Sequence, residues 1–445
     1  MSYTLVKNES WQDVAVNHDL QSVPSDWKIE AFSDVVDICR GGSPRPIQDY
    51  LIDNDLGGMP WIKISDASAV LKYIGDTVQH IKMEGSKHSR TVNPGDLIVS
   101  NSASPGIPRF VTQKACIHDG WLLLTNEKEA DKEFLFHLVN NVRAELCSKG
   151  SGSIFTNLSI EVLNKFQVRK PPLFEQTAIA NILSDQETLI AHCNDLIALH
   201  EKRFAYLSDE LLSGRLRLNK DAPFTVTYND GWREVDVNDE LRSIPDDWLV
   251  KKLGEFSTVV TGSTPITTVG KYWTQDLNGM PWYGTPNLRE LDNLGYIKNA
   301  SKNLTKEGSE TCRICPKGTL LVSCIATIGE LGLLRQDAAF NQQINGILPT
   351  AQHSNSYLRY FFIWRKENLK RLASTSVVLI IKKSLFETFT IFCPLLEEQI
   401  AIANVLSDQE ALIAQYKTLR DAEKKRFDWL SDALLSGTYR VKVES

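Results

Sequence analysis

The sequence predicts a mixed α/β (α+β) protein with two similar globular heads, each followed by one long helix. Thr177 to Ala191 (TAIANILSDQETLIA) returns in the second half of the chain as Ile400 to Ala414 (IAIANVLSDQEALIA), with twelve of fifteen positions identical. GMPW at Gly58 recurs at Gly279, at nearly the same offset. A unit written twice in the same order indicates two copies of one structure in the same chain.

Each repeat begins with a short opening segment, residues 1–21 in the first copy and a linker over residues 215–242 in the second. The motifs SVPSDW at Ser22 and SIPDDW at Ser243 then open the heads. A proline followed by an acidic turn and a tryptophan is typical of a boundary where the chain turns into a core.

Each head combines strand patterns with one helical pattern. DLIVS at Asp96 and TLLVS at Thr319 follow proline and glycine turn signals and predict strands. Helical patterns occupy residues 134–146 and 356–372. We therefore expect a twisted, partly antiparallel sheet in each head.

The end of each repeat predicts a long helix with a heptad seam. Prolines precede both helices, and Ser213-Gly214 and Ser436-Gly437 follow them. A helix of roughly 38 residues is about 57 Å long, too long for an ordinary domain core, so we expect the two helices to pack on each other. In the alternative, each helix packs only on its own head. The expected seam residues are Ile179, Leu183, Gln186, Ile190, Ile197, Phe204, Leu207 and Leu211 in the first helix, and Ile402, Leu406, Gln409, Ile413, Arg420, Phe427, Leu430 and Leu434 in the second.

The net charge of −6 is unevenly distributed. Residues 22–171 carry −1 and residues 243–395 carry +5, so the helices and linkers carry the remaining −10. Two neutral to basic heads are compatible with nucleic acid. The eight cysteines are scattered, and the sequence shows neither a signal peptide nor an apolar run long enough to span a bilayer. We expect a cytoplasmic protein with reduced thiols.

Catalytic signatures are missing from the sequence, which contains no GxxxxGK[ST], no HExxH and no GxSxG. The CxxC at Cys312 and Cys315 stands without a second pair of ligands, so we expect no metal site. His80, His88 and His118 have no histidine at the matching positions of the second repeat, which disfavours a shared catalytic histidine. These observations predict a binding and assembly protein without catalytic residues.

The start of each long helix carries a family resemblance. PPLFEQ at Pro171 and PLLEEQ at Pro394 are each followed by IA and a leucine three residues on. This duplicated block, together with the GGSPRP loop at Gly41 and the GSTP loop at Gly262, resembles the specificity subunit of type I restriction-modification enzymes. The resemblance covers essentially the whole chain. We expect Glu397 to add one residue before the second Glu-Gln and to shift the start of that helix.

The resemblance implies two target recognition domains, residues 22–175 and 243–397. Residues 176–214 and 398–437 would be spacer helices that pair as an antiparallel coiled coil with pseudo-two-fold symmetry, followed by a tail over residues 438–445. It also implies double-stranded DNA and two methyltransferase subunits as partners and, where the system restricts DNA as well as methylating it, two motor-nuclease restriction subunits. S-adenosylmethionine, ATP and Mg²⁺ would bind those partners, and no cofactor would bind this chain.

Two diverged heads on a helical spacer would read an asymmetric bipartite site, with half-sites about one helical turn, or 10 bp, apart. The alternative is a coiled-coil adaptor whose heads bind proteins, a class that the acidic helices also fit.

Base readout uses arginine or lysine for guanine and asparagine or glutamine for adenine, while other polar groups contact phosphates. Side chains of these kinds cluster in loops after GMPW and beside the glycine turns. In the first head the candidates are Arg45, Lys63, Ser65, Lys82, Lys87, Arg90, Asn101 and Arg109, and in the second Thr264, Lys271, Tyr272, Tyr283, Thr285, Asn287, Lys302, Arg313, Asn341, Gln342, Lys382 and Lys383.

Overall fold

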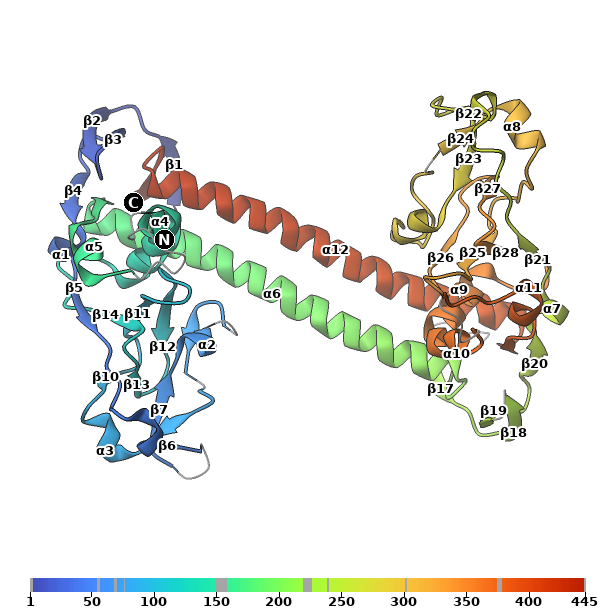
Figure 1. Cartoon of the computed structure of the whole chain (residues 1–445), viewed down its shortest axis with the longest axis horizontal. Helices are drawn as coiled ribbons and strands as arrows, with labels where there is room; N and C mark the ends of the chain where they lie inside the picture. The colour runs from blue at the N-terminus through green and yellow to red at the C-terminus, as the bar shows by residue number, and fades with distance from the viewer. Residues whose placement is uncertain are drawn as a thin grey trace. The chain divides into compact units, whose positions relative to one another are not determined.

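The computed structural model describes residues 3–53, 57–67, 70–75, 77–148, 158–218, 226–237, 240–300, 302–373 and 378–443. It divides into two compact units, one of Met1–His192 with Arg420–Ser445 and the other of Cys193–Leu419 (Figure 1). Each unit contains one head and a part of both long helices. A compact unit is therefore not one sequence repeat, because each unit includes helix from the other repeat.

The first head is built on two mixed sheets. One has the order β5-β14-β11-β12-β8, in which β11 is antiparallel to both of its neighbours and β8 is parallel to β12. The other has the order β10-β13-β7-β9-β6. The strands are β5 (Asp37–Arg40), β14 (Trp121–Thr125), β11 (Leu97–Ser100), β12 (Pro108–Val111), β8 (Tyr73–Ile74), β10 (Arg90–Val92), β13 (Ala115–Ile117), β7 (Met59–Ile62), β9 (His80–Ile81) and β6 (Leu51–Ile52). The predicted strand at DLIVS is confirmed as β11, and the helical pattern over residues 134–146 is confirmed as α4 (Lys132–Ser148).

The second head repeats this plan with two four-stranded sheets, β21-β28-β25-β26 and β22-β24-β23-β27. The strands are β21 (Val259–Thr261), β28 (Ile344–Ile347), β25 (Leu320–Ser323), β26 (Leu331–Leu333), β22 (Trp273–Thr274), β24 (Lys302–Leu304), β23 (Met280–Tyr283) and β27 (Ala339–Phe340). The strand predicted at TLLVS is β25. The helical pattern over residues 356–372 is divided at Arg365 into α9 (Asn355–Trp364) and α10 (Lys366–Arg371).

Short helices and ribbons complete the heads. Strand β4 (Lys28–Ala31) pairs with β15 (Gln167–Lys170), and β20 (Leu249–Lys252) pairs with β29 (Thr390–Cys393). The short helices are α1 (Phe32–Val35), α2 (Ile64–Ala67), α3 (Met83–Ser86), α5 (Ile160–Lys165), α7 (Leu253–Phe256), α8 (Lys306–Glu310), α11 (Lys383–Phe386), η1 (Ile47–Asp49), η3 (Gly270–Tyr272) and η4 (Thr285–Arg289).

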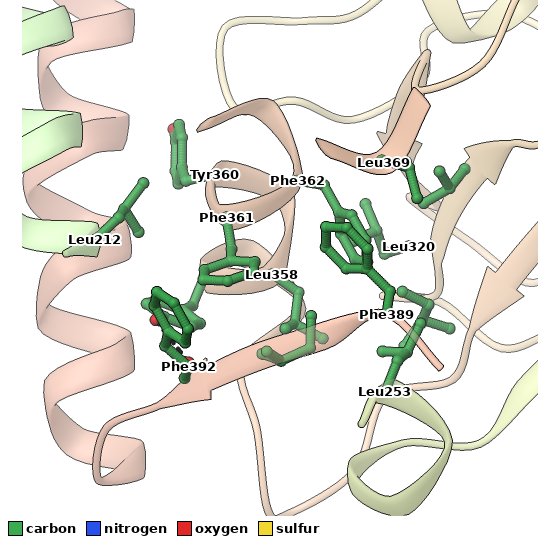
Figure 2. Close-up of a cluster of buried hydrophobic side chains, with 14 of the residues drawn as sticks. Leu212, Leu253, Leu320, Leu358, Tyr360, Phe361, Phe362, Leu369, Phe389 and Phe392 are labelled. Atoms are coloured by element: carbon green, nitrogen blue, oxygen red, sulfur yellow. Dashed lines mark hydrogen bonds between the residues drawn. The ribbon is translucent and has the colours of Figure 1, made fainter. Parts of the chain in front are cut away.

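Aromatic side chains of α9 fill the core of the second unit (Figure 2). Phe362 stacks on Phe389 at a centroid distance of 5.4 Å, and Phe361 meets the edge of Phe392 at 5.5 Å. Leu212, at the end of the first long helix, belongs to the same buried cluster. Fully burying an aromatic or aliphatic side chain stabilises a fold by about 1.5–3 kcal/mol, so this cluster holds α9, β29 and the helix end together.

The two long helices are α6 (Leu173–Leu212) and α12 (Leu396–Leu435), each of 40 residues. The expected shift of the second helix is wrong. Both helices begin two residues before their Glu-Gln pair, and Glu397 stands where the first copy has Phe174. Gly214 and Gly437 follow the helices with φ of +79° and +77°, a left-handed conformation that glycine adopts without strain.

In the first unit, α6 and α12 pack against each other in antiparallel order. Ile179 and Leu183 of α6 share one buried cluster with Leu430 and Leu434 of α12. Further along α6, the Gln186 Nε2 donates a hydrogen bond of 2.6 Å to the Glu423 Oε2. The partner number falls as the α6 number rises, which defines the antiparallel direction.

In the second unit the helices pair in the same sense. The His200 ring stacks on Tyr416 with centroids 5.4 Å apart, while Ile402 and Leu406 share a buried cluster with Leu211. None of the sixteen expected seam residues is exposed. The start of each helix also packs on its own head, as Ile179 does in the first unit. The expected pairing of the two helices is therefore confirmed within each unit, and it occurs beside packing of each helix start on its own head.

The Glu-Gln pair at each helix start anchors the helix to the head. The Gln176 amide donates to the Pro171 carbonyl at 2.8 Å and accepts from the Asp131 backbone at 3.0 Å. In the second copy Gln399 makes the matching bonds to Pro394 and Ser354, at 2.9 and 3.0 Å. Both amides are almost completely buried, so this motif has a structural role.

Two-stranded antiparallel ribbons complete each unit. Strand β1 (Tyr3–Lys7) pairs with β30 (Tyr439–Val443) in the first unit, and β16 (Leu216–Leu218) pairs with β17 (Val226–Tyr228) in the second. A hairpin in each unit joins β2 (Trp11–Val16) to β3 (Asp19–Pro24), or β18 (Trp232–Val237) to β19 (Glu240–Pro245). Within the described part of the chain, no helix combines the length and the apolar character needed to cross a bilayer.

Candidate nucleic-acid interface

A glycine loop is clamped onto a turn between two strands in both heads. The Gly41 and Gly42 amides donate to the carbonyls of Trp121 and Ile117 at 2.8 and 3.0 Å. The turn over residues 118–120 joins β13 to β14, and these strands belong to different sheets. A Cβ atom on Gly41 would lie 2.1 Å from the His118 carbonyl oxygen, so only glycine permits this approach.

The second head repeats the clamp at matching positions. The Gly262 and Ser263 amides donate to the carbonyls of Ile344 and Phe340 at 3.1 and 2.7 Å. The turn over residues 341–343 joins β27 to β28, which again belong to different sheets. A Cβ atom on Gly262 would lie 2.3 Å from the carbonyl oxygens of Phe340 and Asn341. The frame is the same in both heads.

A hydroxyl group of each loop holds the middle residue of the facing turn. The Ser43 Oγ donates to the Asp119 Oδ1 at 2.6 Å, and the Thr264 Oγ1 donates to the Gln342 Oε1 at 2.6 Å. The Ser43 hydroxyl lowers the pKa of the Asp119 carboxyl below its ordinary value of 3.8. The first head therefore presents a carboxylate where the second presents an amide.

Asp119 lies where two surface hollows meet. One hollow is lined by Arg40, Asn101 and His118 among others, and the other by Ser43, Arg45 and Trp61. Asp119 lines both. The Arg45 Nη2 lies 3.9 Å from the Asp119 Oδ2, and the two side chains are 84% and 45% exposed. A ligand at this surface therefore meets a carboxylate beside an exposed guanidinium.

One arginine stands beside the clamp in each head. The Arg90 Nε donates to the Arg40 carbonyl at 3.2 Å, and the Arg313 Nη1 donates to the matching Thr261 carbonyl. Both arginines are exposed, and no carboxylate of the described residues forms an ion pair with either. Anchored in this way, each guanidinium keeps donors for a ligand, and arginine is well suited to phosphate.

Side chains that follow GMPW stabilise the local backbone in both heads. The Asp66 carboxylate accepts from the Lys63 backbone at 2.8 Å, and the Asn287 amide oxygen accepts from the Gly284 backbone at 2.8 Å. Asn287 is buried, and its amide nitrogen donates to the Asn299 carbonyl at 3.0 Å. Tyr283 is buried as well. Asn287 and Tyr283 therefore do not present polar groups at the surface.

Two candidates of the first head are buried. Arg109 donates to the carbonyls of Pro108 and Ala67 at 2.7 and 3.0 Å, and burial lowers its pKa. Asn101 is buried and donates to the Asp119 carbonyl at 3.1 Å, so it stabilises the clamped turn. We leave Arg109, Tyr283 and Asn287 out of the interface proposed below, because a base edge cannot reach a buried side chain.

The remaining candidates lie at or near the surface, several with partners in the same head. Lys82 donates to the Asp49 carbonyl at 2.7 Å, Lys271 pairs with Glu307 at 3.1 Å, and Lys383 lies 3.4 Å from Glu387. Lys302 lies over the Trp273 ring, and Thr285 donates to the Gln343 amide. Lys63, Ser65, Lys87, Tyr272, Asn341 and Lys382 are exposed or partly exposed.

Asp119 was not among the residues predicted from the sequence. A carboxylate is repelled by phosphates, so a search for DNA contacts favours cations and amides. The signal that could have found Asp119 is its repeat position, because it holds the place in the first repeat that Gln342, which was a candidate, holds in the second.

Within the described residues, no group of three or more potential ligands is arranged to hold a metal ion. Burial raises the pKa of the Cys315 thiol to about 11.

Comparison with known proteins agrees with this architecture. The sequence profile of the family described as "Type I restriction modification DNA specificity domain" matches residues 24–199 and again residues 245–422. The type I restriction enzyme MjaIX specificity subunit of Methanocaldococcus jannaschii is 32% identical over 198 residues, which cover 44% of this chain and 45% of that protein. The MjaVIII specificity subunit of the same organism is 22% identical over 98% of this chain and 97% of its own length.

Among solved structures, the type I restriction-modification S subunit from M. genitalium is similar with a TM-score of 0.56. The similarity covers 92% of this chain and 96% of that chain at 13% sequence identity, and it shows a shared fold. The profile matches, one on each head with the adjoining part of its helix, together span well over half of the sequence. The chain belongs to the family of type I restriction-modification specificity subunits, the non-catalytic DNA-recognition components of these systems.

Proposed function

We propose that this chain reads one asymmetric, bipartite DNA sequence and assembles the enzymatic subunits of its complex around that site. The observation that carries the proposal is the clamped loop, built identically in both heads but holding Asp119 in one and Gln342 in the other. Identical frames would dock on DNA alike, and different polar groups would select different bases. The two half-sites should therefore differ in sequence.

The helices α6 and α12 are proposed to set the spacing between the half-sites. A helix of 40 residues is about 60 Å long at 1.5 Å per residue. Recognition modules on one side of a duplex commonly read half-sites about 10 bp apart, centre to centre. Several unread base pairs should separate the two half-sites, and lengthening both helices together should lengthen that gap.

Partner subunits are proposed to supply all of the chemistry. These are two methyltransferase subunits that bind S-adenosylmethionine and, in a restriction complex, two motor-nuclease subunits that use ATP and Mg²⁺. Apolar side chains repeated on the surface support a scaffolding role. Trp11 and Trp232 hold matching positions and are 41% and 39% exposed, and Leu20 and Leu241 on the same hairpins are 77% and 67% exposed. Repeated exposed apolar groups are typical of protein contacts.

The test is to express the chain with its methyltransferase partner in cells that lack other adenine methylation and to sequence the methylome. We expect methylated adenine within a single motif that has two different halves and a fixed gap. A control without this chain should show no such motif. A stable complex that leaves the genome unmodified would contradict the proposal and favour the protein-binding adaptor.

A further inference from the structure

The clamped turns suggest which residue of each head distinguishes between bases. Four features of the frame coincide in the two heads: the clamping glycine, the loop hydroxyl, the hydroxyl's acceptor and the flanking arginine. The side chains of the turn differ in kind, His118-Asp119-Gly120 against Asn341-Gln342-Gln343. A specificity residue needs this combination, because its position must be fixed while its chemistry is free to change.

The hydrogen bond from the loop hydroxyl leaves other donor or acceptor sites free on the middle residue of each turn. One lone pair of the Asp119 Oδ1 is used by the Ser43 hydroxyl, and the rest of the carboxylate remains an acceptor. The Gln342 Oε1 accepts from Thr264, which aims the amide and leaves its NH₂ group as a donor. Asp119 is about half exposed, and Gln342 is exposed. The first head offers acceptors alone, and the second offers an acceptor and a donor side by side.

These capacities match different bases in the major groove. A carboxylate accepts from the N4 amino group of cytosine, whereas a glutamine amide pairs with the N6 and N7 atoms of adenine. Guanine and thymine present acceptors where Asp119 would also present an acceptor, so they are rejected. Adenine places its N7 acceptor beside its N6 donor, and that acceptor repels the second carboxylate oxygen. The nearby guanidinium groups of Arg45 and Arg40 would offset the repulsion between Asp119 and the phosphates.

We propose that Asp119 and Gln342 are equivalent base-reading residues, with Asp119 selecting cytosine in one half-site and Gln342 selecting adenine in the other. This inference rests on the proposed function, since it assumes that both heads read DNA. It adds one residue and one base to each half of the site. Ser43 and Thr264 are positioning residues, because they act through the side chain that they hold.

The test exchanges the two side chains in the assembled methyltransferase complex. Asp119→Gln should change one position of one half-site from C·G to A·T, and Gln342→Asp should change one position of the other half-site from A·T to C·G. A good pair discriminates against the wrong base by about tenfold or more. Asp34→Gln, on an exposed site of α1 in the same head, is the matched control and should leave the motif unchanged.

Binding to duplexes that carry each of the four bases at each half-site position gives a second readout if methylation is lost. If a variant complex loses its preference among the four bases at one half-site position, the inference is supported. If the variant binds every duplex more weakly by the same factor, the inference is overturned. A variant complex that methylates the parental motif at full strength also overturns it and leaves the proposed function standing. If the unmodified complex yields no bipartite motif, the proposed function itself fails.

Substituting the positioning residue separates aiming from folding. Ser43→Ala should reduce discrimination at the position read by Asp119 and at no other, and Ser43→Thr should restore it because threonine does the same task in the second head. Failure of Ser43→Thr to restore discrimination, in a complex that melts at the parental temperature, would contradict the aiming role.

Discussion

The Arg440 Nη2 lies 2.7 Å from the Glu175 Oε2, and this ion pair ties the last strand of the chain to the first turn of α6. Glu175 is 1% exposed, and it also accepts from the Trp27 indole at 3.1 Å. The matching Arg217 donates to Glu398 at 2.8 Å, and Glu398 accepts from Trp248. The glutamate of the duplicated Glu-Gln motif is therefore the centre of one structural network in each unit.

Removing Arg440 should destabilise the first unit strongly. Arg440→Ala leaves the Glu175 carboxylate buried without its cation, which costs about 3–5 kcal/mol in comparable sites. Urea unfolding followed by circular dichroism should show the loss, and Arg217→Ala should act alike on the second unit. Lys271→Ala is the control, because its pair with Glu307 is exposed and screened by solvent, so its loss should change stability little. Equal effects of Arg440→Ala and Lys271→Ala would contradict this account.

The chain should tolerate circular permutation. Strands β1 and β30 pair in antiparallel register from Tyr3 with Val443 to Lys7 with Tyr439, so the first and last strands lie side by side. Strands β16 and β17 form the matching pair within the continuous chain. Joining the ends by a short Gly-Ser linker and opening the chain between Leu218 and Val226 should give a folded protein with an unchanged methylation motif. Opening it between Leu97 and Ser100, inside a buried strand, is the control that should fail to fold.

Stability of the first unit should fall in mild acid because of His137. Burial lowers the pKa of His137 to about 3, and Lys72 adds to the effect. The unfolded chain binds a proton below about pH 6.5 and the folded chain does not, so stability is present at pH 7 and is lost as the pH falls from 6.5 towards 3. At 1.36 kcal/mol per pH unit, the loss at pH 5 is about 2 kcal/mol.

Unfolding free energies measured between pH 5 and 7.5 test this point. His137→Gln can keep a hydrogen bond to the Ser184 hydroxyl, which lies 3.2 Å from the His137 Nε2. This variant should show a pH slope smaller by up to one proton. An unchanged slope in His137→Gln would show that other groups cause the acid loss.

The flanking arginines should contribute affinity without sequence preference. Arg90→Gln and Arg313→Gln should weaken DNA binding equally on all sequences, and each lost phosphate contact should reduce the salt slope by about 0.9. Fluorescence anisotropy at several salt concentrations measures both quantities. Lys28→Gln, on the exposed end of β4, should leave them unchanged. A change in preferred base in Arg90→Gln would instead make this arginine a base-reading residue.

Much of the fold could be predicted from the sequence because it depends on local patterns. Short runs of Leu, Ile and Val after turn signals located β11 and β25, and the heptad spacing located α6 and α12. The composition of the compact units could not be predicted. It depends on which head the far end of each helix contacts, and a seam of Ile and Leu residues does not encode that choice.

The candidate site was predicted less well than the fold, because polar residues look alike in a sequence. Asn287 and Arg109 form hydrogen bonds with backbone groups of their own heads, and these partners are known only from the folded chain. Asp119 has the charge that a search for DNA contacts discards. The folded chain holds it opposite Ser43, in the position that Gln342 holds opposite Thr264.

The clamped turn joins two strands that belong to separate sheets, and its backbone is held by glycine amides of a third segment. The middle side chain of the turn, Asp119 in the first head and Gln342 in the second, can therefore change without altering a strand register or a core side chain. Under the proposed function, a change of target base at this position needs no change of fold.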